Sequence, residues 1–271
     1  MTIKSCAKLA GAVAVCLAIG LAAMSIKAPR AHADDDDTES RIKIGLAIAP
    51  VPLNLHGKDR AMVGLGSYLV NAIGDCNGCH TSGGPPNFNY APGGNPYFNQ
   101  PNVVDPTVYL SGGQNFGQVG TPTGPNGYAG PFMITRNLTP DKNGRPEGGH
   151  SLKEFTQIFR HGTDFDHIHP TCTPEQITEI ENGATPVCIP SSPDNPVDGD
   201  LLQVMPWPTF SNLSDRDIEA IYVYLSAIPC IDNTTSPPPD GAPNELRNDC
   251  GTAAAVKNST TRQAPRSRQA H

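Results

Sequence analysis

Five consecutive residues, Cys76-Asn77-Gly78-Cys79-His80, constrain this chain more than any other part of its sequence. The order Cys-x-x-Cys-His is the attachment signal for c-type haem. Two thiols three positions apart on a tight turn can each add across one vinyl group of the porphyrin, and the next residue then lies beneath the iron. We therefore expect one haem c, attached covalently through Cys76 and Cys79, with His80 as an axial iron ligand.

A Cys-x-x-Cys pair also occurs in thiol redox centres and as half of many zinc sites. This chain has no second Cys-x-x-Cys to complete a zinc cluster. No thioredoxin-like βαβ pattern surrounds the motif either. The sequence therefore favours haem attachment over both alternatives.

Residues 1–33 have the pattern of a secretory signal peptide. They begin with Lys4 and Lys8, continue with an apolar run over 9–24 and end with Ala31-His32-Ala33, a small-x-small cleavage site. The alternative is an uncleaved anchor, but the run is shorter than the ~20 residues needed to span a bilayer. We expect a periplasmic or otherwise exported protein, a location that suits both haem attachment and disulfides.

The remaining chain is acidic. Of the 19 basic residues, four lie in the leader, which leaves 15 basic against 26 acidic residues. Such a body argues against nucleic acid as a partner and is compatible with a positively charged protein face. The last 21 residues carry four basic side chains and no acidic one. We expect this tail to be disordered, with a weak case for peripheral association with a membrane.

Gly and Pro together make up about one residue in five and interrupt the chain often, so we expect short helices. Three of them are indicated. Apolar residues at helical spacing mark 60–74, 151–162 and 214–228. Capping-box patterns open the second and third, and Pro229 ends the last. Gly66, inside the first helix, allows close approach of another helix or is merely tolerated. The fold class is mostly α.

A haem electron carrier usually has a second, non-exchangeable iron ligand. The methionines that follow the leader are Met62, Met133 and Met205. Pro206 and Pro208 hold the chain around Met205 extended, which is a good way to present a thioether. The alternative for Met205 is a core gap-filler, the usual role of a methionine.

Several motifs together resemble a monohaem class I cytochrome c, and most closely the cytochrome c domains of alcohol and sugar dehydrogenase cytochrome subunits. They are Cys-x-x-Cys-His, Leu110-Ser-Gly-Gly113, Asn137-Leu-Thr-Pro-Asp141, Arg160-His-Gly162, Met205-Pro206, Leu213-Ser-Asp and Tyr222-Val-Tyr-Leu225. The resemblance spans residues 57–231. It implies a small helical fold around one covalent haem, with Cys76, Cys79, His80 and Met205 holding the haem and its iron.

Two departures from the family limit this resemblance. Dehydrogenase subunits usually contain several such domains, whereas this chain has one Cys-x-x-Cys-His. It also has long, irregular, Gly/Pro-rich insertions at about 81–109 and 163–203, neither of which has the pattern of a separate domain. Residues 34–56 and 232–271 are assigned as N-terminal and C-terminal extensions.

Three further residues are candidates for contact with the haem. Arg136 and Asn137 are placed to meet haem propionates or the Met205 loop, since an Arg fork pairs well with a carboxylate. Trp207, the single tryptophan, is expected to pack against the haem beside Met205, with an exposed docking role as the alternative.

Four cysteines outside both the motif and the leader permit three pairings. We favour Cys172–Cys188 and Cys230–Cys250, since each closes a short local loop; cross-pairing is the alternative. His161, His167 and His169 with Asp164 and Asp166 could form a metal site or supply rival iron ligands, but a solvated loop is favoured. Asp194, Asp198 and Asp200 lack the spacing of a calcium loop.

The expected function is one-electron transfer between redox proteins such as a dehydrogenase, an oxidase or another cytochrome. Thioether ligation and burial raise the potential relative to bis-histidine ligation, and no enzymatic group is required. A second hypothesis is a haem enzyme or gas sensor with an open or displaceable sixth ligand. A third is an interaction subunit whose insertions attach it to a dehydrogenase or oxidase.

Overall fold

The computed structural model describes residues 33–118, 130–184, 187–193, 196–233 and 248–251. The predicted leader, apart from its last residue Ala33, and the basic tail beyond 251 lie outside these ranges. The described residues from Glu39 onward form one compact unit. No helix in the described ranges has the length and apolar character needed to cross a membrane.

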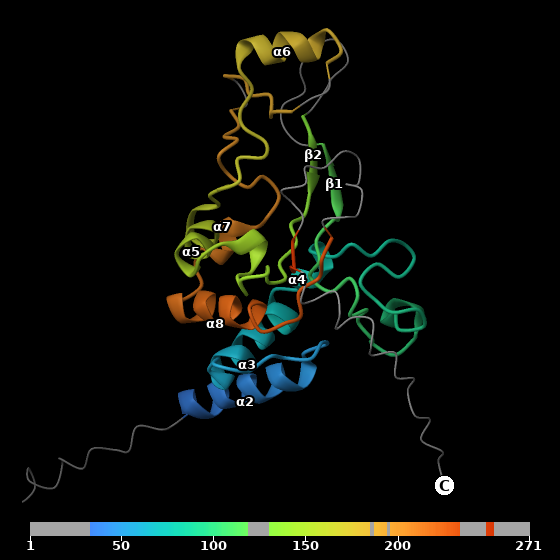
Figure 1. Ribbon diagram of the computed structural model, residues 1–271, viewed down its shortest axis with the longest axis vertical. Helices are drawn as coiled ribbons and strands as arrows, with labels where there is room; N and C mark the ends of the chain where they lie inside the picture. The colour runs from blue at the N-terminus through green and yellow to red at the C-terminus, as the bar shows by residue number, and fades with distance from the viewer. Residues whose placement is uncertain (1–32, 119–129, 185–186, 194–195, 234–247, 252–271) are drawn as a thin grey trace, which may run out of the picture. The chain divides into compact units, whose positions relative to one another are not determined.

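Helices and one two-stranded sheet make up the regular structure of the described residues (Figure 1). The α-helices are α2 (Ala33–Ile48), α3 (Arg60–Tyr68), α4 (Cys76–Cys79), α5 (Leu152–His161), α6 (Pro174–Glu181), α7 (Trp207–Phe210) and α8 (Asp215–Leu225). Shorter turns of helix are η2 (Leu69–Ile73), η3 (Pro96–Phe98) and η4 (Glu147–Gly149). The strands are β1 (Asn115–Gln118) and β2 (Phe132–Ile134), which pair antiparallel.

The predicted helix at 60–74 is confirmed as α3 and its continuation η2. Asp59 begins it, because its carboxylate accepts a hydrogen bond from the Ala61 backbone N–H at 2.8 Å. The helix ends at Gly74, whose N–H donates to the Leu69 carbonyl at 2.7 Å. The π-helical last turn leads directly into the Cys-x-x-Cys-His segment.

Helix α8 packs against α3 (Figure 1), and a glycine lies at the contact. A Cβ placed on Gly66 would collide with the backbone carbonyl of Ala220 and with the Cβ of Tyr224. The glycine therefore permits close approach of the two backbones, which is one of the two explanations that the sequence left open. The Ser214 hydroxyl caps α8 by accepting from the Asp217 N–H at 3.1 Å, as predicted.

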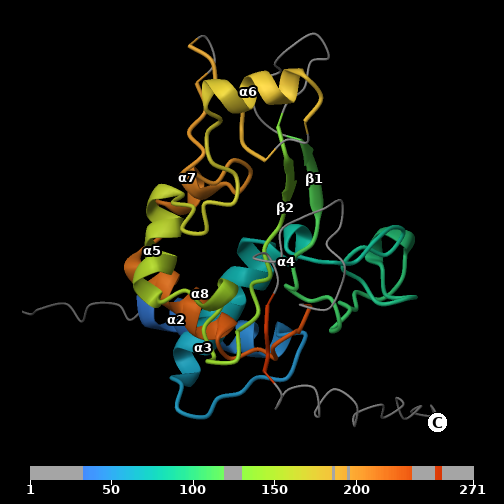
Figure 2. The same cartoon turned by 45° about the horizontal axis from the view of Figure 1, so that its top comes forward.

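Helix α5 confirms the helix predicted at 151–162. Ser151 and Glu154 form both hydrogen bonds of a capping box, and Gly162 ends the helix with a φ of +68°. Its buried face carries Phe155 and Phe159, whose rings lie 4.7 Å apart. The helix lies beside α7 and α8 (Figure 2).

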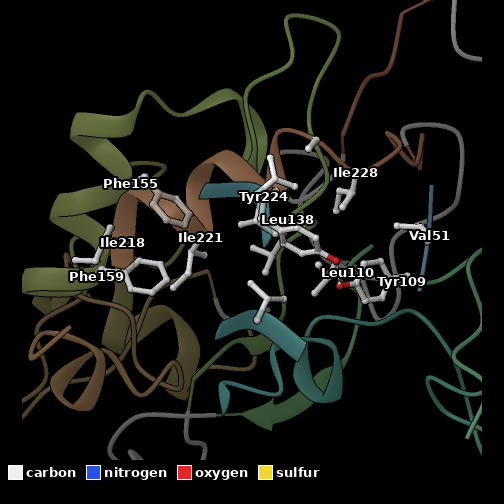
Figure 3. Packing of buried hydrophobic residues seen from close by; sticks show 14 of the residues in the cluster. Val51, Tyr109, Leu110, Leu138, Phe155, Phe159, Ile218, Ile221, Tyr224 and Ile228 are labelled. Carbon is white, nitrogen blue, oxygen red and sulfur yellow. Dashed lines mark hydrogen bonds between the residues drawn. The ribbon is translucent and has the colours of Figure 1, made fainter. Parts of the chain in front are cut away.

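The buried side chains of α3, α5 and α8 form one core, together with residues from the loops between them (Figure 3). A polar network lies within this core. The hydroxyl oxygens of Tyr109 and Tyr224 are 2.7 Å apart, and the Tyr109 hydroxyl donates to Asn71 Oδ1 at 2.7 Å. Asn71 Nδ2 donates to the Ser67 hydroxyl, which in turn donates to the Gly45 carbonyl of α2. The N-terminal extension therefore packs onto the helices through α2.

The two insertions differ in regularity. Apart from η3 and an isolated bridge between Tyr90 and Val104, the described part of 81–109 is irregular, as expected. The segment 163–203 contains α6, which the sequence analysis did not predict. Its signal was present: Thr173 and Gln176 form a capping box, and Pro174 occupies the first helical position.

Both disulfides have the short-loop pairing expected from the sequence. Cys172 is bonded to Cys188, with Cα atoms 4.9 Å apart, and Cys230 to Cys250, with Cα atoms 5.7 Å apart. Cys76 and Cys79 are the free cysteines of the described residues. The two motif thiols are therefore available for another chemistry.

Candidate functional site

The Cys-x-x-Cys-His segment forms a compact helical turn. Asp75 enters it with a left-handed backbone (φ 43°, ψ 43°), and the His80 N–H donates to the Cys76 carbonyl at 2.8 Å. The buried Asn77 side chain accepts a hydrogen bond from the Leu110 N–H at 2.8 Å. This bond attaches the turn to the loop at 110–113.

The turn forms part of the wall of a cavity of about 240 Å³. Apart from a few polar groups, aliphatic and aromatic side chains line it, from α5, α7, α8 and the neighbouring loops. Its lining includes Cys76, Cys79, His80, Met133, Arg136, Glu147, Phe155, Phe159 and Met205. The cavity thus brings Met205 together with both motif cysteines and His80, although these two segments lie far apart in the sequence.

A backbone carbonyl fixes the His80 imidazole. Its Nδ1 lies 2.9 Å from the carbonyl oxygen of Arg136. Because a carbonyl only accepts hydrogen bonds, Nδ1 donates, and the lone pair remains on Nε2. Burial lowers the pKa of His80, which favours the neutral form that a metal ligand needs.

The two cysteines differ in exposure. Cys76 is partly buried and Cys79 is exposed. Burial, reinforced by the Asp75 carboxylate, raises the pKa of Cys76 to about 12 and also raises that of Cys79. Unmodified, both would be protonated thiols at neutral pH, which is unlike the low-pKa thiolate of a redox-active Cys-x-x-Cys centre.

Two methionines reach the cavity, Met133 from β2 and Met205 from the loop before α7. Met62 is not among the lining residues. Met205 lies at a bend directly before α7, so the extended chain expected around it is wrong: Pro206 has a ψ of 47° and Pro208 lies inside α7. Met133 reaches the same cavity from a strand. Met133 is therefore the natural comparison for any test of Met205.

Arg136 also lines the cavity, but its guanidinium forms ion pairs with carboxylates of the chain itself. Its two terminal nitrogens pair with Asp164 at 2.5 Å and with Asp166 at 2.8 Å. The side chains of Arg136 and Asp164 are 11% and 8% exposed. The expectation of a solvated loop is therefore wrong at Asp164, because an ion pair draws that side chain inward.

Two of the residues predicted to touch the haem have other partners. Asn137 is buried but does not line the cavity; its Nδ2 donates to the Ile231 carbonyl at 3.0 Å. Trp207 is half-buried, also outside the lining, with its ring against Gly162 and its Nε1 donating to the Leu202 carbonyl at 3.1 Å. Both side chains fix loops next to the cavity, and their expected contact with the haem stays a prediction.

Glu147 is a cavity residue that sequence reasoning missed. It is buried, and this burial raises its pKa despite the nearby Arg136. Its position in Pro-Glu-Gly-Gly carries no pattern typical of a binding site. Only the packing of η4 against the cavity reveals it.

The histidine-rich segment 161–169 was a candidate metal site. Across the described residues, no group of three or more His, Cys, Asp or Glu side chains is arranged to hold a metal ion. His167 instead pairs through Nδ1 with Asp200 at 3.1 Å. His169 is partly buried and borders a second, smaller cavity of about 60 Å³.

Comparison of this chain with family models, curated proteins and solved structures found no match.

Proposed function

We propose that this protein is a c-type cytochrome with a single covalent haem and the class I helical fold, and that it transfers one electron at a time. The observation that carries the proposal is the shared cavity wall. Cys76, Cys79, His80 and Met205 all line one largely apolar cavity. Two thiols, an imidazole and a thioether are the donor set that a His/Met-ligated haem c requires.

The residues present fit this group. A porphyrin is large, flat and apolar, and Phe155 and Phe159 offer it aromatic walls whose burial favours binding. His80 has its Nδ1 proton engaged by a backbone carbonyl, so that Nε2 is free to bind a metal. When bound, haem supplies an iron centre that gains and loses one electron without net bond making.

The chain's own residues would hold and insulate that centre. Cys76 and Cys79 would form the thioether bonds, and His80 and Met205 would provide the axial ligands. The apolar walls keep water away, and together with thioether ligation this raises the reduction potential. No nucleophile or proton shuttle is needed, so the proposed activity is electron transfer and not an enzymatic reaction.

The proposed setting is the periplasm or another exported location, because of the leader pattern and the two disulfides. The proposed partners are redox proteins: a dehydrogenase, an oxidase or another cytochrome. The acidic body favours a basic partner face and disfavours nucleic acid. The basic tail would allow peripheral association with a membrane.

The test is an absorption spectrum of the purified protein, oxidised and reduced, with and without carbon monoxide, on wild type, Met205→Ala and Met133→Ala. We expect covalently bound haem, a near-infrared methionine-to-iron band in wild type and Met133→Ala, and loss of the band in Met205→Ala. Carbon monoxide should bind only the Met205 variant. Loss of the band in Met133→Ala instead would reassign the ligand.

Ready binding of carbon monoxide to the wild-type protein would contradict the electron-carrier proposal. It would favour the second hypothesis, a haem enzyme or gas sensor with an open or displaceable sixth ligand. A protein that carries no covalent haem after expression with the haem-attachment machinery would overturn both.

A further inference from the structure

The C-terminal extension is hydrogen-bonded to the loop that follows Arg136. Asn248 is only 1% exposed. Its Nδ2 donates to the carbonyl oxygens of Thr139 and Pro140, at 3.0 and 2.9 Å, and lies 3.1 Å from the Thr139 hydroxyl. Losing this amide would leave buried acceptors without a donor, which is costly.

The other end of the same disulfide loop makes matching contacts. The Ile231 N–H donates to the Thr139 hydroxyl at 3.1 Å, and the Ile231 carbonyl accepts from Asn137 Nδ2 at 3.0 Å. Asn233 joins the two ends, because its Oδ1 accepts from the Asn248 N–H at 2.7 Å. We call residues 230–233 and 248–250, joined by Cys230–Cys250, the C-terminal clamp.

The clamp also reaches the second loop beside the cavity. Asn233 Nδ2 donates to the Ser111 carbonyl at 3.2 Å. The clamp therefore touches both 110–113 and 136–140. These loops are bound to each other, since the Leu138 N–H donates to the Leu110 carbonyl at 2.8 Å.

These two loops are the ones that hold His80. The Gly112 N–H donates to the His80 carbonyl at 3.2 Å, and the Arg136 carbonyl accepts from His80 Nδ1 at 2.9 Å. Gly112, with a φ of +66°, has no room for a Cβ, which would meet the Arg136 backbone. The clamp contacts Ser111 and Asn137, the chain neighbours of both of these His80 partners.

We infer that the C-terminal clamp positions the His80 imidazole, by fixing the Arg136 carbonyl that its Nδ1–H donates to. This inference rests on the proposed function. A firm hydrogen bond to Nδ1–H makes the imidazole a stronger electron donor to a bound metal, and such outer partners orient the ligand. Asn248 and the disulfide are thus positioning groups outside the cavity.

The test compares three variants of the haem-loaded protein: Cys230→Ser/Cys250→Ser, Asn248→Ala, and Cys172→Ser/Cys188→Ser. The last is the matched control, because it removes the other short-loop disulfide, whose cysteines make none of these contacts. The readouts are solvent exchange of the His80 Nδ1–H, followed by NMR with ¹⁵N-labelled histidine in the reduced state, and the midpoint potential.

For both clamp variants we expect exchange to accelerate about tenfold or more, because local opening becomes easier. The midpoint potential should rise, because a weaker hydrogen bond makes His80 a poorer donor to ferric iron. The control should match wild type in both readouts. Unchanged exchange and potential in a folded clamp variant would overturn the inference, and so would an equal change in the control.

Asn248→Ala keeps the disulfide and decides the matter if the double cysteine variant does not fold. The proposed function fails separately, in the wild type: a spectrum without His/Met-ligated covalent haem contradicts that function before any variant is compared. A wild type with that spectrum and clamp variants without effect would contradict the clamp alone.

Discussion

Gly66 of α3 lies directly against the backbone carbonyl of Ala220 in α8. The contact sets the distance between the two helices that carry the core. Both contribute to the wall of the cavity, α3 through Val70 of its continuation η2 and α8 through Ile221 and Leu225. Because Gly66 has no side chain, α3 and α8 can approach closely enough to form that wall together.

Gly66→Ala should therefore destabilise the protein. An alanine gains about 1 kcal/mol of helix propensity over glycine, but its methyl group meets backbone that cannot rotate away. Such overpacking costs about 1–3 kcal/mol, so we expect a net loss, measured by chemical denaturation. Gly84→Ala is the control, because nothing lies within 4 Å of a Cβ there. Equal stability of the two variants would contradict the close crossing.

Tyr224→Phe should cost about 0.5–1.5 kcal/mol of unfolding free energy, because it removes one hydrogen-bond partner each from the Tyr109 hydroxyl and from Asn71 Nδ2, which keep their bonds to Asn71 Oδ1 and to Ser67. The Tyr224 hydroxyl lies 2.7 Å from that of Tyr109 and accepts from Asn71 Nδ2 at 3.1 Å. Tyr97→Phe, at a side chain 85% exposed, should leave stability unchanged. Thermal or denaturant unfolding of both variants decides whether the network stabilises the core.

The same tyrosines predict a loss of stability in alkali. Burial raises the pKa of both Tyr109 and Tyr224 above the ordinary value of 10.0. A group whose pKa is higher in the folded state stabilises fully below its unfolded pKa, and that contribution falls as pH rises from about 10 toward the folded pKa. Tyr109→Phe/Tyr224→Phe should show a shallower decline above pH 10 than wild type or Tyr97→Phe. A decline of equal steepness in all three would contradict the burial of these hydroxyls.

Asp164→Asn should destabilise the protein by about 3 kcal/mol, because it removes one partner of a nearly buried arginine. Arg136 would keep Asp166 as its remaining partner. Glu39→Gln is the matched control, since Glu39 pairs with Lys43 where both side chains are largely exposed; its effect should be far smaller. Denaturation of both variants at low and high salt separates the cases, and a strongly salt-dependent loss at Asp164 would contradict its burial.

Removing the proposed haem attachment should lower the stability of the protein as well as its content of covalently bound haem. Cys76→Ala/Cys79→Ala leaves His80 and Met205 in place but removes both proposed thioether bonds. Phe155 and Phe159, which line the cavity, would then face water instead of a porphyrin. We expect loss of covalently bound haem on a denaturing gel and a lower unfolding midpoint by circular dichroism. A variant as stable as wild type would argue that the core forms without the haem.

Much of the local structure could be predicted. The helices at 60–74, 151–162 and 214–228 follow from apolar periodicity and capping residues, which act over a few neighbouring positions. Both disulfides follow from short loops. Helix α6 was missed although Thr173 and Gln176 carry a capping box, because segment 163–203 was assigned as an irregular, Gly/Pro-rich insertion.

The candidate site was predictable only in part. The Cys-x-x-Cys-His segment and Met205 carry their signal in the sequence, and both line the cavity. Asn137 and Trp207 were given roles at the cavity but have backbone partners elsewhere. Sequence proximity to a motif does not say which way a side chain points, because χ angles depend on packing with distant segments.

By itself, the sequence determined where the three helices at 60–74, 151–162 and 214–228 lie, which cysteines close short loops and which five consecutive residues have the pattern of a haem-attachment segment. All of these depend on residues close together along the chain. Only the tertiary structure decided that Met133 joins Met205 at the cavity and that Asn248 supports the loop holding His80. It also decided that Asp164 and Asp166 form ion pairs with Arg136. These contacts join segments many residues apart, and they form because buried polar and charged groups must find partners once the core excludes water.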